Sequence, residues 1–191
     1  NNKQKHLTNG RVFILEKKNK KVQFEDLEFD YLVGDGDFRS DQVKNFRNIE
    51  KCEIRPCDSV NIIYGQNAQG KTNLLESIWL FTGCNSFRTR KNSELIKENE
   101  KEAQLNMDFF AFNREQEVEI KIGENKEVHI NGIKKNTHRQ LLGEFQAVVF
   151  SPSVLSVIKE GPGEKRKFID IAISLLKPNY AATLSKYNKA V

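Results

Sequence analysis

The chain has 191 residues, of which 31 are lysine or arginine and 26 are aspartate or glutamate, so its formal net charge is +5. This length favours one domain or slightly more. Hydrophobic residues make up 38% of the sequence and no apolar run approaches the length of a membrane-spanning helix, which excludes a membrane protein. Three cysteines without a secretory signal exclude a disulfide-stapled secreted module, so we expect a cytoplasmic protein.

The first 42 residues carry blocks of opposite charge, basic and then acidic, and we assign them no function. Such blocks are typical of solvated, loosely ordered segments. Short strands are expected at residues 12–15 and 22–24, and the glycine-rich stretch at residues 34–37 predicts a loop.

Beyond about Val43, the pattern becomes that of a globular protein. Strands are expected at residues 49–54, 60–64, 105–112, 118–122, 128–130 and 147–150. Helices are expected at residues 72–81, 137–142, 164–176 and 181–191, where Pro178 separates the last two. This order of elements predicts an α/β or α+β layered domain.

The most specific motif is G-x-x-x-x-G-K-[ST], which lies between an apolar strand and an amphipathic helix. It comprises Gly65, Gln66, Asn67, Ala68, Gln69, Gly70, Lys71 and Thr72, and Asn73 follows it. Its glycines let the backbone wrap around phosphates, and the N–H groups at the helix start attract the anion. Lys71 would place a charge beside the β- and γ-phosphates, and the Thr72 hydroxyl would ligate Mg²⁺. The motif therefore predicts a nucleotide-binding site.

Hydrolysis requires further groups, namely a carboxylate on the metal ion and a residue that orients water. In P-loop proteins the metal-supporting acid normally ends an apolar strand, but no such strand after the motif is followed by Asp or Glu. The best candidate, at residues 147–150, is followed by Ser151 and Pro152. We identify no catalytic residue within this chain and predict negligible ATP turnover by it alone.

Several separated motifs resemble the bacterial RecF family. They include V-K-N-F-R-N at residues 43–48, the extended P-loop at 61–76, S-F-R-T at 86–89, H-I-N-G at 129–132 and V-V-F-S-P at 148–152. Matching stretches follow at residues 159–170 and 187–190. The resemblance implies the N-terminal half of an ABC-type ATPase head, with a mixed sheet around the P-loop helix, and the start of a helical arm. It divides the chain into an unassigned charged segment at 1–42, the head at 43–160 and the arm at 161–191.

The resemblance also implies a function. RecF-like proteins bind ATP and Mg²⁺, bind gapped or duplex DNA, and work with RecR and RecO to load the recombinase during DNA repair, replication and the SOS response. The complete protein is expected to form an ATP-dependent homodimer with weak DNA-dependent ATPase activity. The metal-supporting acid and the signature motif of such heads lie far downstream, so the chain resembles an unfinished head.

Two further groups of residues are candidates for contacts. Asn45 and Arg47 belong to a stretch that approaches the nucleotide in related ATPases, although Arg47 could equally be a surface hairpin arginine. The basic residues that follow Phe87 suit contacts to the DNA backbone. They are Arg88, Arg90 and Lys91. The favoured alternative is that Phe87 lies in the core beside a solvated run of charges.

Two departures from the family and two other functions remain open. The first departure is that residues 1–42 do not match the family, and the second concerns two acidic residues. Ser153 and Val154 stand where the family commonly has Glu and Asp, near a loop that senses the γ-phosphate, which puts that coupling in doubt. The motif also occurs in P-loop kinases and GTPases, but the N-K-x-D element of GTPases is absent. A DNA-binding module with a vestigial loop is the other alternative function.

The cysteines lack C-x-x-C spacing, which argues against a metal site.

Overall fold

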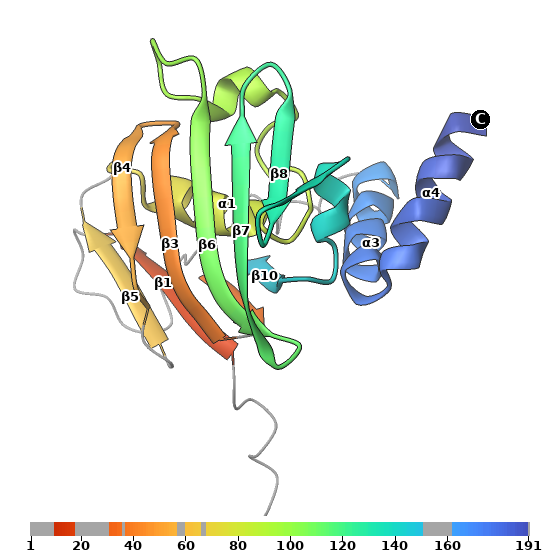
Figure 1. Cartoon of the computed structure of the whole chain (residues 1–191), viewed down its shortest axis with the longest axis horizontal. Coiled ribbons are helices and arrows are strands. Elements are labelled where there is room, and N and C mark those ends of the chain that lie inside the picture. Colours follow the sequence, from red (N-terminus) through yellow and green to blue (C-terminus); the bar gives the residue numbers. More distant parts are fainter. Residues whose placement is uncertain are drawn as a thin grey trace, which may run out of the picture.

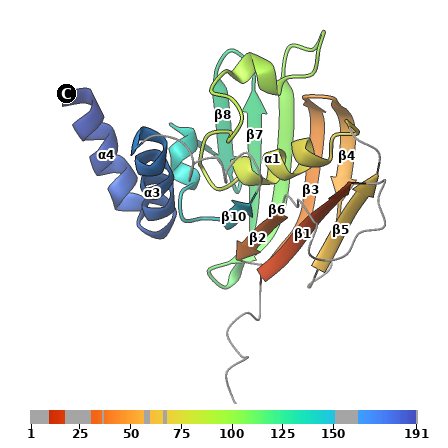
Figure 2. The same ribbon diagram turned by 180° about the vertical axis from the view of Figure 1, so that it is seen from behind.

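The computed structural model describes residues 10–17, 31–35, 37–56, 60–65, 68–150 and 162–190. The strands are β1 (Gly10–Lys17), β2 (Tyr31–Asp35), β3 (Asp37–Phe46), β4 (Ile49–Ile54), β5 (Val60–Gly65), β6 (Ala103–Ala111), β7 (Arg114–Ile122), β8 (Lys126–Ile130), β9 (Ile133–Lys135) and β10 (Gln146–Phe150). The helices are α1 (Lys71–Leu80), α3 (Pro162–Leu176) and α4 (Pro178–Ala190), with 3₁₀ turns η2 (Asn92–Leu95) and η3 (His138–Leu141). The described strands form two sheets, and α1 packs against both (Figures 1 and 2).

The smaller sheet has the strand order β10-β2-β1-β5 and is mixed, because β1 runs parallel to β5 while β2 is antiparallel to its neighbours. The strand expected at residues 12–15 lies inside β1, whereas the one at 22–24 falls outside the described residues. The prediction of a loop at residues 34–37 is wrong for the three of these residues that the structure describes. Gly34 and Asp35 belong to β2 and Asp37 begins β3, because Gly34 pairs with strands on both sides and needs no side chain to do so.

The larger sheet is antiparallel and has the order β4-β3-β6-β7-β8-β9. Strands β6, β7 and β8 alternate between a buried and a more exposed face, as their sequences predict. On β6, for example, Leu105, Met107 and Phe109 are buried, whereas Asp108 between them is exposed. The sheet therefore has one apolar face for the core and one polar outer face.

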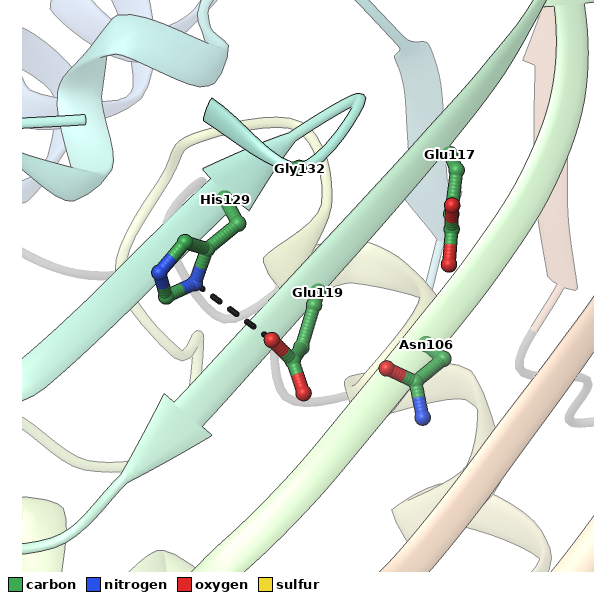
Figure 3. Close-up of a pocket in the computed structure, with 5 residues that line it drawn as sticks. All are labelled: Asn106, Glu117, Glu119, His129 and Gly132. Atoms are coloured by element: carbon green, nitrogen blue, oxygen red, sulfur yellow. Dashed lines mark ion pairs between the residues drawn. The ribbon is translucent and has the colours of Figure 1, made fainter. Parts of the chain in front are cut away.

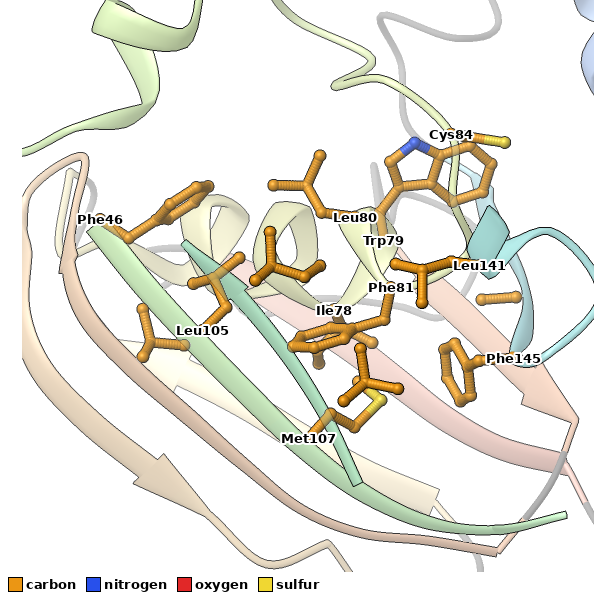
Figure 4. Close-up of a cluster of buried hydrophobic side chains, with 14 of the residues drawn as sticks. Phe46, Ile78, Trp79, Leu80, Phe81, Cys84, Leu105, Met107, Leu141 and Phe145 are labelled. Carbon is orange, nitrogen blue, oxygen red and sulfur yellow. The ribbon is translucent and has the colours of Figure 1, made fainter. Parts of the chain in front are cut away.

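The core lies between α1 and the apolar face of the larger sheet (Figure 4). Leu75 and Ile78 of α1 are fully buried there. Trp79 donates its indole N–H to the carbonyl of Asn85 at 2.9 Å, and its ring meets Phe87 edge-on with centroids 6.3 Å apart. Phe87 is partly buried and packs against the core, which agrees with the part of the favoured alternative that concerns Phe87.

Gly83 closes the turn after α1 in a conformation that only glycine adopts easily. Its φ is +81°, and an added Cβ would lie 2.7 Å from the backbone nitrogen of Leu142. Gly132 has a similar φ of +75° but no atom within 4 Å of its added Cβ. Gly83→Ala is therefore expected to lower the free energy of unfolding by about 3 kcal/mol, and Gly132→Ala by about 1 kcal/mol. Urea unfolding measures both, and equal losses would contradict the clash at Gly83.

The two C-terminal helices form a hairpin at one side of the molecule (Figure 1). Pro162 and Pro178 occupy the first positions of α3 and α4, where a missing N–H costs no helical hydrogen bond. The Tyr180 hydroxyl donates to the Asp170 carboxylate at 2.6 Å and joins the helices. Among the described residues, no helix combines the length and the apolar character needed to cross a membrane. β3 runs across the domain boundary expected at residue 43, and the division into domains stays a prediction.

Candidate nucleotide-binding site

The P-loop motif occupies the connection from β5 to α1, which is the strand–loop–helix setting that the sequence predicts. Gly65 ends the strand, and Lys71 and Thr72 are the first two residues of α1. Gly70 is the N-cap of the helix and lies in the left-handed region, with φ of 90°. No acidic residue lies in the first turn, so the positive end of the helix faces no carboxylate of its own. Gln66 and Asn67 lie outside the described residues.

Asn48, in the turn between β3 and β4, holds the loop from the side. Its Nδ2 donates to the carbonyl of Ala68 at 2.8 Å, and its Oδ1 accepts from Nδ2 of Asn73 at 2.7 Å. A Cβ added to Gly70 would lie 2.7 Å from that same Oδ1. We did not single out Asn48 from the sequence, and the only signal for it is its place in the V-K-N-F-R-N stretch.

Glu76 of α1 has a fully buried side chain that forms ion pairs with two arginines. Arg47 binds it through Nε at 2.5 Å and Nη2 at 2.8 Å, in the bidentate geometry that suits a guanidinium. Arg88 reaches it with Nη1 at 3.2 Å, and the Ser86 hydroxyl also donates to it. This cluster joins the β3–β4 turn, α1 and the segment that follows α1.

In the structure, Asn45 and Arg47 both bind groups of the protein outside the P-loop motif. Arg47 pairs with Glu76, and its Nη1 donates to the carbonyl of Glu94 at 3.0 Å. Asn45 donates from Nδ2 to the Glu100 carboxylate at 3.0 Å. Their contacts with a nucleotide stay predictions.

The three basic residues after Phe87 differ in their partners and in their exposure. Arg88 turns back onto α1, because its Nη1 donates to Oδ1 of Asn73 at 2.6 Å as well as to Glu76. Lys91 pairs with Glu94 at 3.6 Å, and Arg90 is exposed. Contacts from these three residues to DNA stay a prediction.

A separate depression of about 220 Å³ lies on the outer face of the larger sheet (Figure 3). It is lined by Asn106, Glu117, Glu119, His129 and Gly132, and Glu119 Oε2 lies 3.4 Å from His129 Nδ1. Two carboxylates would repel a phosphate at this place. In the described part of the chain, no group of three or more His, Cys, Asp or Glu side chains could hold a metal ion. This depression is therefore a poor candidate for the nucleotide site.

Two expectations about the chemistry of the site concern residues 151–161, which the structure does not describe. They are the absence of an acid after the strand at 147–150, which is β10, and the substitution at Ser153 and Val154. Cys52 is partly buried and Cys84 is buried, and burial raises the pKa of both thiols. Neither is arranged as a reactive group.

Comparison with known proteins shows the family to which this chain is similar. The model of the RecF/RecN/SMC N-terminal domain matches residues 39–167. The DNA replication and repair protein RecF of Thermoanaerobacter sp. (strain X514) is 44% identical over 149 residues, which are 77% of this chain and 41% of that protein. RecF of Clostridioides difficile (strain 630) is 38% identical over 154 residues, or 80% of this chain and 42% of that protein. The chain thus spans about two fifths of the length of these relatives.

Solved structures agree with the sequence comparison. A structure described as the recombination mediator protein RecF with ATP in the RecFOR pathway has a TM-score of 0.72 at 39% identity, covering 80% of this chain and 43% of that chain. A chain from a study of ATP-driven dimerization and DNA-stimulated activation of SMC ATPases has a TM-score of 0.55 at 22% identity, covering 70% of this chain and 98% of that one. The second likeness concerns the fold alone. The resemblance to RecF is confirmed: this chain belongs to the RecF/RecN/SMC N-terminal domain family, with the fold of the N-terminal half of an ABC-type ATPase head.

Proposed function

We propose that this chain is the ATP-binding part of a RecF-like DNA recombination and repair protein. The observation that carries the proposal is the P-loop, in which a left-handed Gly70 leads directly into Lys71 and Thr72 at the start of α1. A helix start with no acid in its first turn suits the phosphates of a nucleotide. The RecF relative described in complex with ATP supports the same ligand.

In this proposal, the backbone N–H groups, the Lys71 side chain and the Thr72 side chain have separate roles. The N–H groups at the start of α1 bind phosphate oxygens, and Lys71 neutralises charge at the β- and γ-phosphates. The Thr72 hydroxyl orients a Mg²⁺ ion, which would supply further charge neutralisation. Asn45 and Arg47 lie near the nucleotide, and Arg47 contributes less than Lys71 because Glu76 already balances its charge.

Lys71→Ala tests the proposal in a titration of Mg·ATP followed by calorimetry. The wild-type chain is expected to bind, and the variant at least about a hundredfold more weakly, because a charge-assisted contact is lost. Lys121→Ala is the control, since this lysine pairs with Glu119 on the outer face of the larger sheet. Equal affinities of the wild type and Lys71→Ala would overturn the assignment of the nucleotide site.

The whole protein is proposed to bind gapped or duplex DNA in the cytoplasm, to form an ATP-dependent homodimer, and to act with RecR and RecO. Its weak DNA-dependent ATPase activity would need the metal-supporting acid and signature motif that we find nowhere in this sequence. The relatives named DNA replication and repair protein RecF and recombination mediator protein RecF support the DNA-repair role. Arg88, Arg90 and Lys91 are proposed to contribute backbone contacts to DNA.

A DNA-binding isotherm of the complete protein, with and without Mg·ATP, separates this function from that of a DNA-binding module with a vestigial loop. The proposed function predicts tighter DNA binding and dimer formation when ATP is present. A vestigial loop predicts an isotherm that responds to salt but not to ATP.

A further inference from the structure

Ala68 lies in the P-loop with a backbone conformation that is unfavourable for it. Its φ is +63°, in the left-handed region, where the Cβ of an L-residue is crowded by the backbone. Among the described residues of the motif, Gly70 shares this region but pays no such penalty, because it has no Cβ. Some contact has to favour the left-handed conformation at Ala68.

Asn48 supplies that contact. Its Nδ2 donates to the Ala68 carbonyl at 2.8 Å across 20 residues of sequence. The orientation of its amide is fixed, because Asn73 donates to the Oδ1 of Asn48 at 2.7 Å. With the oxygen occupied by a donor, only the nitrogen can face the Ala68 carbonyl.

The far end of this chain of hydrogen bonds is also anchored. Arg88 donates to the Oδ1 of Asn73 at 2.6 Å and is itself held by the buried carboxylate of Glu76. Asn73 is therefore oriented from two sides, and it belongs to the first turn of α1. The contacts run from α1 through Asn48 to the loop, so the position of Ala68 is tied to the helix start that binds phosphate.

We propose that Asn48 is a positioning residue for nucleotide binding, which holds Ala68 in the left-handed conformation and so shapes the P-loop. This inference rests on the proposed function. Asn48 acts through the loop backbone and makes no contact with the nucleotide itself. Its contribution is therefore to the phosphate part of the ligand, whatever base is attached.

Two replacements of Asn48 test this role. Asn48→Ala removes both hydrogen bonds and should weaken Mg·ATP binding about five- to tenfold. Asn48→Asp keeps the acceptor for Asn73 but places a carboxylate oxygen against the Ala68 carbonyl, so its loss should be at least as large. Mg²⁺-tripolyphosphate should lose affinity by the same factor as Mg·ATP. Asn136→Asp makes the same charge change in an exposed turn and should leave binding unchanged.

A double-mutant cycle distinguishes positioning from a general loss of structure. Glycine adopts a positive φ without strain, so Ala68→Gly removes the need for the hydrogen bond from Asn48. In the Ala68→Gly background, Asn48→Ala should weaken binding by about threefold or less. The melting temperature of the ligand-free Asn48 variants is measured alongside, because folding defects would appear there and would not depend on residue 68.

Three results would overturn the inference while leaving the proposed function intact. They are wild-type affinity in Asn48→Asp, a loss confined to ATP and not seen with tripolyphosphate, and an undiminished loss in the Ala68→Gly background. Failure of the wild-type chain to bind either ligand would instead refute the proposed function.

Discussion

Glu76→Gln is expected to lower the free energy of unfolding by about 3 kcal/mol, because it removes the buried charge that Arg47 and Arg88 both bind. The Glu76 side chain is fully buried, and that of Arg47 is 15% exposed. Glutamine preserves the shape, but its amide nitrogen would face N–H groups of Arg47 or Arg88. Arg47 would then remain largely buried without its bidentate partner, which is the costly outcome when one partner of a buried pair is removed.

Urea unfolding at neutral pH measures this effect, with Glu50→Gln as the matched control. Glu50 also pairs with a basic residue, Lys97 at 3.2 Å, but its side chain is 82% exposed. The control is expected to change stability by about 0.5 kcal/mol or less. Similar small effects of both substitutions would show that the Glu76 cluster does not hold the β3–β4 turn against α1.

Asp41→Asn is expected to remove a contribution to the pH dependence of stability that amounts to about 5 kcal/mol between pH 4 and pH 9. Asp41 lies on β3, is fully buried, and its Oδ1 has no hydrogen-bond partner. Burial raises the pKa of its carboxyl to about 8, and the hydrogen bond with Ser77 at 3.3 Å opposes this only in part. The native chain therefore holds a proton on Asp41 at pH 7 that the unfolded chain has released.

The direction of the effect follows from these protons. Between the unfolded pKa of 3.8 and the folded pKa of about 8, the native state binds more protons, so stability falls as pH rises, by about 1.4 kcal/mol per pH unit. His138 acts in the opposite direction. Burial, and the nearby charge of Lys126, lower its pKa to about 3, so its contribution rises with pH up to about 6.5. The decline due to Asp41 should thus stand out between about pH 6.5 and pH 8.

The measurement is the free energy of unfolding of wild type and Asp41→Asn across this pH range. Their difference isolates Asp41, because His138 is present in both proteins. Asp108→Asn is the control, since Asp108 is exposed on the neighbouring strand and accepts from Ser40 at 2.7 Å. Parallel curves for wild type and Asp41→Asn would mean that Asp41 is ionised and solvated at neutral pH.

The local parts of this fold could be predicted from the sequence, because they depend on neighbouring residues. The P-loop is contiguous, and its glycines and the apolar runs on either side define strand, loop and helix together. The helix expected at residues 72–81 is observed as Lys71–Leu80, and the strand expected at residues 60–64 as Val60–Gly65. The helices expected at residues 164–176 and 181–191 begin two and three residues earlier, because proline is tolerated in a first helical turn.

The parts that the sequence did not reveal depend on contacts between distant segments. Asn48 and Ala68 are 20 residues apart, and Arg47 and Glu76 are 29 apart, so no local pattern joins them. Asp41 lies in a polar run of the sequence, S-D-Q at residues 40–42, which does not indicate that it is buried. A register shift between Phe38 and Ser40 turns it inward instead, and alternation counted from the sequence cannot anticipate such a bulge.

The N-terminal strands were obscured for a related reason. Lysine-rich and acidic blocks around β1 and β2 suggest a solvated segment, yet β1 pairs in parallel with β5 and β2 pairs with β10. A parallel partner lies far away in sequence by necessity, so its contribution to strand formation cannot be seen in a local window.

The central claim is that nucleotide phosphates bind at the P-loop and the start of α1. An amide NMR titration of the isotope-labelled chain with Mg·ATP tests it most directly. The account predicts that the largest shifts fall on the backbone amides of residues 68–73 and on the side-chain amide of Asn48. Shifts centred on Asn106, Glu119 and His129, with the P-loop unchanged, would place the ligand in the depression of Figure 3 and contradict the account.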